Sequence, residues 1–155
     1  MTAGALFFAL KGEKSDGHSF LKEVAAKGAV SAVVDQGYRG ETFGLVLLRA
    51  AHVREALQTM ARKIQEKRKC RVVAVTGSVG KTTTKEFLAT LLSSKWSVMK
   101  TPGNANSQAS LPLVLLNQKE ETEILVAEMG ISEPGEMIRL VNVRQYKVSL
   151  AILSK

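Results

Sequence analysis

The sequence predicts an α/β protein: a small N-terminal α/β domain is followed by an incomplete second domain, whose mainly parallel sheet is flanked by helices. Three observations lead to this expectation. Short apolar, β-branched runs alternate with segments whose apolar residues recur at helical spacing. The run Val72–Thr76 is typical of a parallel strand buried on both faces. A glycine-rich turn follows it directly. We expect the first domain, with a linker helix, to span residues 1–70 and the second to span 71–155.

The first domain reads as strand, helix, strand, strand and then a long helix. We expect the strands at residues 6–10, 31–35 and 45–48, and the helices at 17–27 and 50–69. Gly28 has the place of a C-terminal cap for the first helix. The long helix carries one apolar face, made by Val53, Leu57, Met60, Ala61 and Ile64.

The second domain continues the alternation of strands and helices. Beyond the strand at 72–76, we expect strands at 96–99, 123–128 and 148–153, and helices at 82–94, 110–117 and 134–143. In the helix at 82–94, we expect four apolar side chains to face the core: Phe87, Leu88, Leu91 and Leu92. The polar segment 101–108 reads as a loop at the same sheet edge as the glycine-rich turn.

The composition is that of a basic globular chain. It has 155 residues, 45% of them hydrophobic, which is enough for one ordinary domain or two small ones. The net charge of +8 suits nucleic acid, a membrane surface or anionic small molecules. The most basic run, residues 62–71, has no interleaved aromatics of the kind that stack on nucleic acid. We interpret it as a solvated helix end, and phosphate-bearing substrates account for the charge equally well.

Nothing in the sequence predicts a membrane or secreted protein. No apolar run reaches the roughly 18 residues that a membrane span needs, and the apolar start at residues 1–10 lacks the basic residues of a secretory signal. The single cysteine, Cys70, excludes an internal disulfide and is interpreted as incidental, although its basic neighbours Lys69 and Arg71 could lower the thiol pKa. We therefore expect a cytoplasmic protein.

The glycine-rich turn reads Gly77-Ser78-Val79-Gly80-Lys81-Thr82. It follows a strand and opens a helix, which is the setting of an ATP-type phosphate-binding loop, or P-loop. Gly77 and Gly80 allow positive φ and close approach of the backbone to oxygen atoms, and a helix N-terminus attracts phosphate. The usual pattern has glycine five residues before Gly80, where this chain has Val75, so the loop is a shortened variant.

We predict ATP and Mg²⁺ as the ligands of this P-loop domain. Lys81 should neutralise the β- and γ-phosphates, and the hydroxyl of Thr82 should ligate Mg²⁺. The predicted nucleotide-binding residues are Gly77, Ser78, Val79, Gly80, Lys81, Thr82 and Thr83.

A second Mg²⁺ ligand is predicted by elimination. Mg²⁺ takes carboxylate oxygen beside the phosphates, and the only aspartates, Asp16 and Asp35, lie upstream in the other domain. Glu128 ends the apolar strand at 123–128, at the same sheet edge as the loop. We therefore predict Thr82 and Glu128 as metal ligands, with Lys81 and Glu128 as the catalytic residues. The alternative role of Glu128 is to cap the turn after its strand.

Four groups of residues form a specific combination. They are Thr76–Glu86; Gly103–Asn106 with Leu111–Leu113; Glu128–Gly130 with Pro134–Glu136; and Leu6–Gly12 with Asp16–His18 and Phe20. Together they resemble the Mur ligases, the ATP-dependent amino-acid ligases of peptidoglycan synthesis. The details Ser78 and Lys85-Glu86 favour the MurF type, and the resemblance covers nearly the whole chain.

The resemblance implies a ligase that joins D-alanyl-D-alanine to UDP-N-acetylmuramoyl-tripeptide. ATP would phosphorylate the carboxylate of the tripeptide, and the amine of D-alanyl-D-alanine would attack the resulting acyl phosphate. Lys81 would hold the γ-phosphate, Thr82 and Glu128 would hold Mg²⁺, and Asn104 and Asn106 would lie near the sugar-peptide. Residues 1–70 would form a UDP-sugar-binding domain.

The resemblance also implies an N-terminal fragment of a longer ligase, inactive in ligation alone. The family has an Asp-Ser-Arg segment before its first strand, and its last matching strand runs into Thr-Asn where this chain has Ser154-Lys155. Ser107 stands where the family often has another Asn. Two alternatives stay open: another P-loop NTPase or kinase, and a non-catalytic nucleotide- or nucleic-acid-binding protein. A GTPase would need Asn-Lys-x-Asp, which Asn117–Glu120 does not match.

Overall fold

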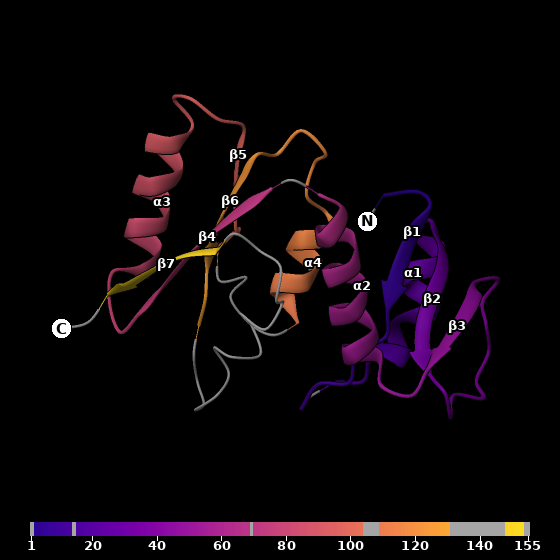
Figure 1. Ribbon diagram of the computed structural model, residues 1–155. Coiled ribbons are helices and arrows are strands. Elements are labelled where there is room, and N and C mark those ends of the chain that lie inside the picture. The colour runs from indigo at the N-terminus through magenta and orange to yellow at the C-terminus, as the bar shows by residue number, and fades with distance from the viewer. Residues whose placement is uncertain (1, 14, 69, 104–108, 131–147, 154–155) are drawn as a thin grey trace. The chain divides into compact units, whose positions relative to one another are not determined.

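The computed structural model describes residues 2–13, 15–68, 70–103, 109–130 and 148–153. The chain divides into two compact units, Met1–Thr59 and Met60–Lys155. Each unit contains its own parallel sheet (Figure 1). The α/β fold class predicted from the alternating pattern is therefore confirmed.

The first unit is a three-stranded parallel sheet in the order β1-β2-β3. Its elements are β1 (Ala5–Phe8), the 3₁₀ turn η1 (Gly17–Phe20), α1 (Leu21–Ala26), β2 (Ala29–Asp35) and β3 (Val46–Ala50). Leu21 and Val24 of α1 pack on Ala32 and Val34 of β2 in one buried cluster. The alternation of β2 sends these two residues to one face, so α1 covers that face of the sheet.

Helix α2 (Val53–Lys67) has the apolar face that its spacing predicts. Val53, Leu57 and Ala61 are buried at intervals of four residues, whereas Met60 is 38% exposed. Met60 begins the second unit, so the division between the units falls inside α2. The predicted boundary between domains at residue 70 stays a prediction.

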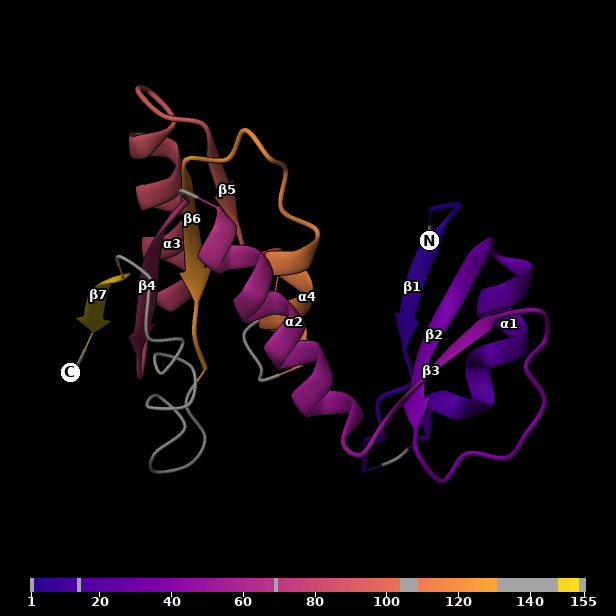
Figure 2. The same cartoon turned by 45° about the vertical axis from the view of Figure 1, so that its right-hand side comes forward.

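The second unit is a four-stranded parallel sheet in the order β5-β6-β4-β7. The strands are β4 (Arg71–Gly77), β5 (Val98–Lys100), β6 (Ile124–Glu128) and β7 (Val148–Leu153), and the helices are α3 (Lys81–Leu92) and α4 (Ser110–Leu116). Val72 and Ala74 of β4 pack with Leu111 of α4, while Val75 packs with Ala89 of α3. The two helices therefore lie on opposite faces of the sheet (Figures 1 and 2). Burial on both faces explains the continuous apolar run of β4.

The predicted inner face of α3 is partly wrong. Phe87 is 69% and Leu91 58% exposed, whereas Leu88 and Leu92 pack against the core as expected. Leu88 and Leu92 share a stripe with the buried Lys85 and Ala89. Phe87 and Leu91 each come one residue earlier than Leu88 and Leu92, so they lie on another side of the helix. The apolar pattern could not select this stripe because one of its buried members is a lysine.

Two other differences concern the ends and the coverage of elements. The strand expected at residues 96–99 begins at Val98, because the amide of Trp96 donates to Leu92 O and belongs to the turn after α3. The helix expected at 134–143 lies outside the described residues. Among the residues that are described, no helix has the length and apolar character to cross a membrane.

Candidate functional site

The loop between β4 and α3 has the backbone geometry that its glycines predict. Gly77 has φ 142° and Gly80 has φ 77°, both in the region that residues with a side chain rarely adopt. Gly80 is the residue that precedes the first turn of α3, and Thr84 N donates to its carbonyl. The loop thus leads from the carboxyl end of a central strand into a helix N-terminus.

Lys81 lies at the start of α3 and turns back over this loop. Its Nζ donates to Gly77 O at 2.7 Å. This hydrogen bond keeps the ammonium group next to the backbone that forms the loop. The side chain is only partly buried.

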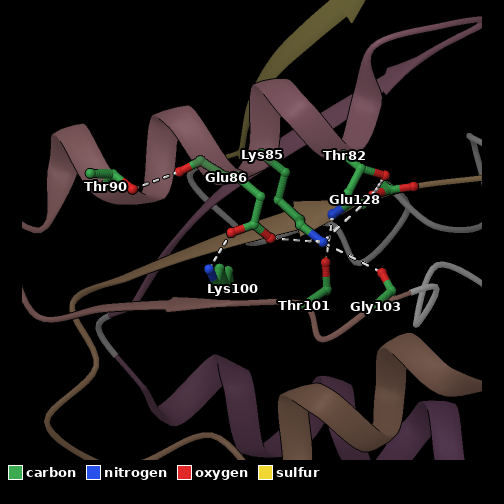
Figure 3. A network of polar contacts seen from close by, with 8 residues as sticks. All are labelled: Thr82, Lys85, Glu86, Thr90, Lys100, Thr101, Gly103 and Glu128. Carbon is green, nitrogen blue, oxygen red and sulfur yellow. Dashed lines mark hydrogen bonds and ion pairs between the residues drawn. The ribbon is translucent and has the colours of Figure 1, made fainter.

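Glu128 lies at the carboxyl end of β6, which pairs with β4 so that Glu128 stands opposite Val75. It is 3% exposed. Thr82 Oγ1 donates to Glu128 Oε2 at 2.9 Å, a contact between residues 46 positions apart (Figure 3). The backbone of Glu128 is also held, because its N–H donates to Thr101 Oγ1 at 2.9 Å. The fold therefore brings together the two residues that the sequence suggested as metal ligands.

The residues present at this position fit a magnesium ion. Thr82 supplies a hydroxyl and Glu128 a carboxylate, which are oxygen ligands of the kind that Mg²⁺ takes. Mg²⁺ is commonly held by one or two protein oxygens, with phosphate oxygens and water completing its shell. The donor set beside the P-loop suits that arrangement.

The structure adds Lys85 to this site, a residue that the sequence analysis used only as evidence for the MurF type. Lys85 lies one turn after Lys81 and is 1% exposed. Its Nζ lies 3.6 Å from Glu128 Oε2 and 3.5 Å from Glu86 Oε1. Glu86 also accepts from Lys100, and this hydrogen bond is the main reason that the pKa of Glu86 lies below its usual value. The sequence signal that could have identified Lys85 is a charged residue within an apolar helical pattern.

The predicted substrate residues Asn104 and Asn106 lie outside the described residues. Cys70 is described and buried, and burial raises the pKa of its thiol. The lowering effect of basic neighbours considered from the sequence is therefore outweighed. Gln118 Nε2 donates to Cys70 Sγ at 2.7 Å and gives the residue a structural setting.

The first unit contains a separate cavity of about 380 Å³. Its lining includes both basic and acidic side chains, which are Lys11, His18, His52 and Arg54 among the basic ones and Asp35 and Glu55 among the acidic ones. His18 is held from both ring nitrogens: Nδ1 lies 2.6 Å from Asp16 Oδ1, and Nε2 accepts from Asp35 N at 3.0 Å. A histidine oriented in this way presents a fixed ring beside the cavity.

Family models match both parts of the chain. The model described as "Mur ligase family, catalytic domain" matches residues 1–95, and the model described as "Mur ligase middle domain" matches residues 75–155. The chain belongs to the Mur ligase family. The predicted resemblance to this family is thereby confirmed.

Individual Mur ligases extend the similarity to the MurF type. The chain is 39% identical over 132 residues to the UDP-N-acetylmuramoyl-tripeptide–D-alanyl-D-alanine ligase of Bacillus subtilis, a match that covers 85% of this chain and 29% of that protein. It is 35% identical over 150 residues to the ligase of the same name from Escherichia coli, with 97% and 32% covered. The chain thus spans about a third of the length of the relatives it matches.

Solved MurF structures share the fold. The MurF ligase of Thermotoga maritima, crystallised in complex with ADP, superposes with a TM-score of 0.82 at 38% identity, covering 98% of this chain and 35% of that one. A MurF structure from Acinetobacter baumannii gives a TM-score of 0.84 at 34% identity, with 97% and 32% covered. These similarities concern the fold and the family.

Proposed function

We propose that this chain supplies the N-terminal and nucleotide-binding parts of an ATP-dependent ligase that joins D-alanyl-D-alanine to UDP-N-acetylmuramoyl-tripeptide. The observation that carries the proposal is the 2.9 Å contact between Thr82 and Glu128, next to the loop that carries Lys81. The loop, the ammonium group of Lys81 and the proposed metal ligands Thr82 and Glu128 lie together at one sheet edge. The MurF names of the similar proteins supply the substrate class.

The P-loop would bind the nucleotide through residues 77–83. The positive φ values of Gly77 and Gly80 let the backbone approach phosphate oxygens closely, and the first turn of α3 offers N–H groups without intrahelical acceptors. Lys81 would exchange the neutral carbonyl of Gly77 for the γ-phosphate, since a charged acceptor forms the stronger hydrogen bond.

Thr82 and Glu128 would hold Mg²⁺ against the nucleotide. When bound, the metal neutralises phosphate charge that develops during transfer. The burial of Glu128 strengthens the electrostatic interactions of its carboxylate, because fewer water molecules screen it. Phosphoryl transfer to the tripeptide carboxylate would give an acyl phosphate, which the amine of D-alanyl-D-alanine attacks with loss of phosphate.

Two further elements are proposed to bind the UDP-linked substrate. The cavity of the first unit has a size that suits part of a UDP-linked substrate, and Lys11 and Arg54 in its lining would contact the phosphates. Asn104 and Asn106 are proposed to contact the sugar-peptide, on the basis of the family resemblance. Reliance on ATP and a UDP-linked precursor leads us to place the protein in the cytoplasm.

The function can be tested by grafting this chain onto a known ligase. A chimaera in which residues 1–155 replace the matching third of the Bacillus subtilis protein should release phosphate only when ATP, UDP-N-acetylmuramoyl-tripeptide and D-alanyl-D-alanine are all present. The same chimaera with Lys81→Ala is the matched control and should be inactive. A folded chimaera that releases no phosphate, or releases it without the two other substrates, would contradict the proposal.

A further inference from the structure

Lys85 has the largest of the side chains that are almost completely buried in the described part of the chain. Removing an ammonium group from water is unfavourable unless opposite charge and hydrogen-bond acceptors surround it. A leucine at this position would satisfy the apolar stripe of α3 without that cost. The presence of a lysine therefore calls for a role that depends on its charge.

The ammonium group of Lys85 lies between three oxygen atoms from separate segments. It lies 3.6 Å from Glu128 Oε2 at the end of β6 and 3.5 Å from Glu86 Oε1 on α3. It donates to Gly103 O, after β5, at 3.4 Å (Figure 3). All three distances exceed the roughly 2.7–2.9 Å of a tight charge-assisted hydrogen bond. The group is thus shared among its partners, and its position depends on all of them.

Two of these partners, Glu128 and Gly103, belong to the proposed metal site and to the segment before a predicted substrate residue. Glu128 Oε2 is also the oxygen that accepts from Thr82, so Lys85 acts on the same carboxylate oxygen that faces the predicted metal ligand. Gly103 directly precedes Asn104, a predicted substrate residue. The third partner, Glu86, is tied to the exposed Lys100 and lies on the solvent side of the network.

We propose that Lys85 is a positioning residue, whose buried ammonium group fixes the carboxylate of Glu128 and the backbone at Gly103 relative to each other. This inference rests on the proposed function, because it assigns Glu128 to Mg²⁺. Lys85 would act through the carboxylate of Glu128, since groups that orient metal ligands influence metal affinity without touching the metal. Lys85 therefore couples the metal side of the nucleotide site to the segment that follows β5.

The test compares Lys85→Met with Lys100→Met, a control that removes the other lysine of Glu86 and leaves Glu128 untouched. ADP affinity is measured by calorimetry with and without Mg²⁺, and the ratio of the two affinities gives the Mg²⁺ enhancement. We expect Lys85→Met to reduce this enhancement by about 10- to 100-fold, to change Mg²⁺-free ADP binding by less than about threefold, and Lys100→Met to change neither. Hydrogen exchange in residues 98–103, measured with saturating Mg²⁺ and ADP, should be faster in Lys85→Met only.

The possible outcomes separate this inference from the proposed function. If the unmodified protein shows no Mg²⁺ enhancement, the proposed function fails. If the unmodified protein shows enhancement and folded Lys85→Met keeps or increases it, the positioning role is wrong, and an increase would mean that the ammonium group competes with the cation.

If Lys85→Met does not fold, the double variant Lys85→Met/Glu128→Gln shows whether the lost charge or the lost packing is the cause. The double variant removes both buried charges. Recovery of the fold supports the inference, because it shows that Lys85 acts on the carboxylate of Glu128. A double variant that also fails to fold would show a packing role and overturn the inference.

Discussion

Lys81 and Glu128 occupy two different electrostatic settings within one site. The ammonium group of Lys81 is partly buried and bonded to a neutral carbonyl, so a phosphate can replace that partner with a gain in hydrogen-bond strength. The carboxylate of Glu128 is almost fully buried and already interacts with Thr82 and Lys85. Replacing Lys81 should therefore affect binding alone, whereas replacing Glu128 should affect both binding and stability.

The variant Lys81→Ala should lose ATP affinity and keep its fold. A hydrogen bond to a charged group contributes about 1.5–3 kcal/mol, which corresponds to roughly 10- to 150-fold in affinity. Because the side chain is only partly buried, the free energy of unfolding should change by less than about 0.5 kcal/mol. Calorimetric titration with ATP and thermal unfolding measure the two quantities, and Lys119→Ala, at an exposed residue, is the control. Unchanged ATP affinity would refute the assignment of Lys81.

The variant Glu128→Gln should weaken Mg²⁺-dependent nucleotide binding and also lower stability. The substitution keeps the shape of the side chain and removes the charge opposite Lys85, which leaves Glu86 as the remaining carboxylate beside that ammonium group. We expect the free energy of unfolding to fall by about 1–3 kcal/mol. Urea unfolding and Mg²⁺ titration in the presence of ADP check both effects. If the Mg²⁺ affinity is unaltered, another group binds the metal.

At the scale of elements, the prediction from sequence succeeded where one physical rule determined the structure. The apolar run of β4 and the glycines after it gave a buried strand and a loop with positive φ, because burial on both faces and left-handed backbone leave few alternatives. The pairing of Thr82 with Glu128 followed from the rule that parallel strands end at one sheet edge.

The same reasoning failed where tertiary contacts decided the outcome. The stripe of α3 that faces the core includes Lys85 and excludes Phe87, because a buried charge network competes with apolar burial. No local pattern shows that β6 and the segment after β5 supply oxygens for this lysine. Similarly, the contact of His18 with the backbone of Asp35 joins residues 17 positions apart and leaves no periodic signal.

The start of η1 in the first unit offers a test of local structure. Asp16 is its N-terminal cap, and its side chain accepts from His18 N at 3.0 Å. This backbone hydrogen bond, followed by the bond from the His18 ring, holds the pKa of Asp16 below the 3.8 of an unperturbed aspartate. We expect Asp16→Ala to lower the free energy of unfolding at neutral pH by about 1 kcal/mol, the usual effect of losing a cap.

The pH dependence of this effect has a definite sign. Because the pKa is lower in the folded state, the ionised carboxylate stabilises the fold above pH 3.8, and this contribution is lost as the pH falls through the folded-state pKa. The difference between Asp16→Ala and the unmodified protein should therefore shrink as the pH is lowered from 7 towards 3. Urea unfolding across that range measures it, and a difference that grows on acidification would contradict the role of Asp16.

At the scale of the whole molecule, the two units carry different parts of the proposed function. The first unit has a cavity with both basic and acidic side chains, and the second has the P-loop and the Thr82–Glu128 pair. The family models match both units, and the solved MurF structures cover nearly the whole chain. The net charge of +8 of the whole chain agrees with phosphate-bearing ligands.

The central claim is that the second unit binds an adenine nucleotide together with Mg²⁺. The most direct measurement is calorimetric titration of the protein with ATP and with GTP, each with and without Mg²⁺. We predict measurable ATP binding that Mg²⁺ strengthens, with clearly weaker binding of GTP, and loss of the Mg²⁺ effect in Glu128→Gln. Equal affinity for the two nucleotides, or ATP binding that does not respond to Mg²⁺, would contradict the account.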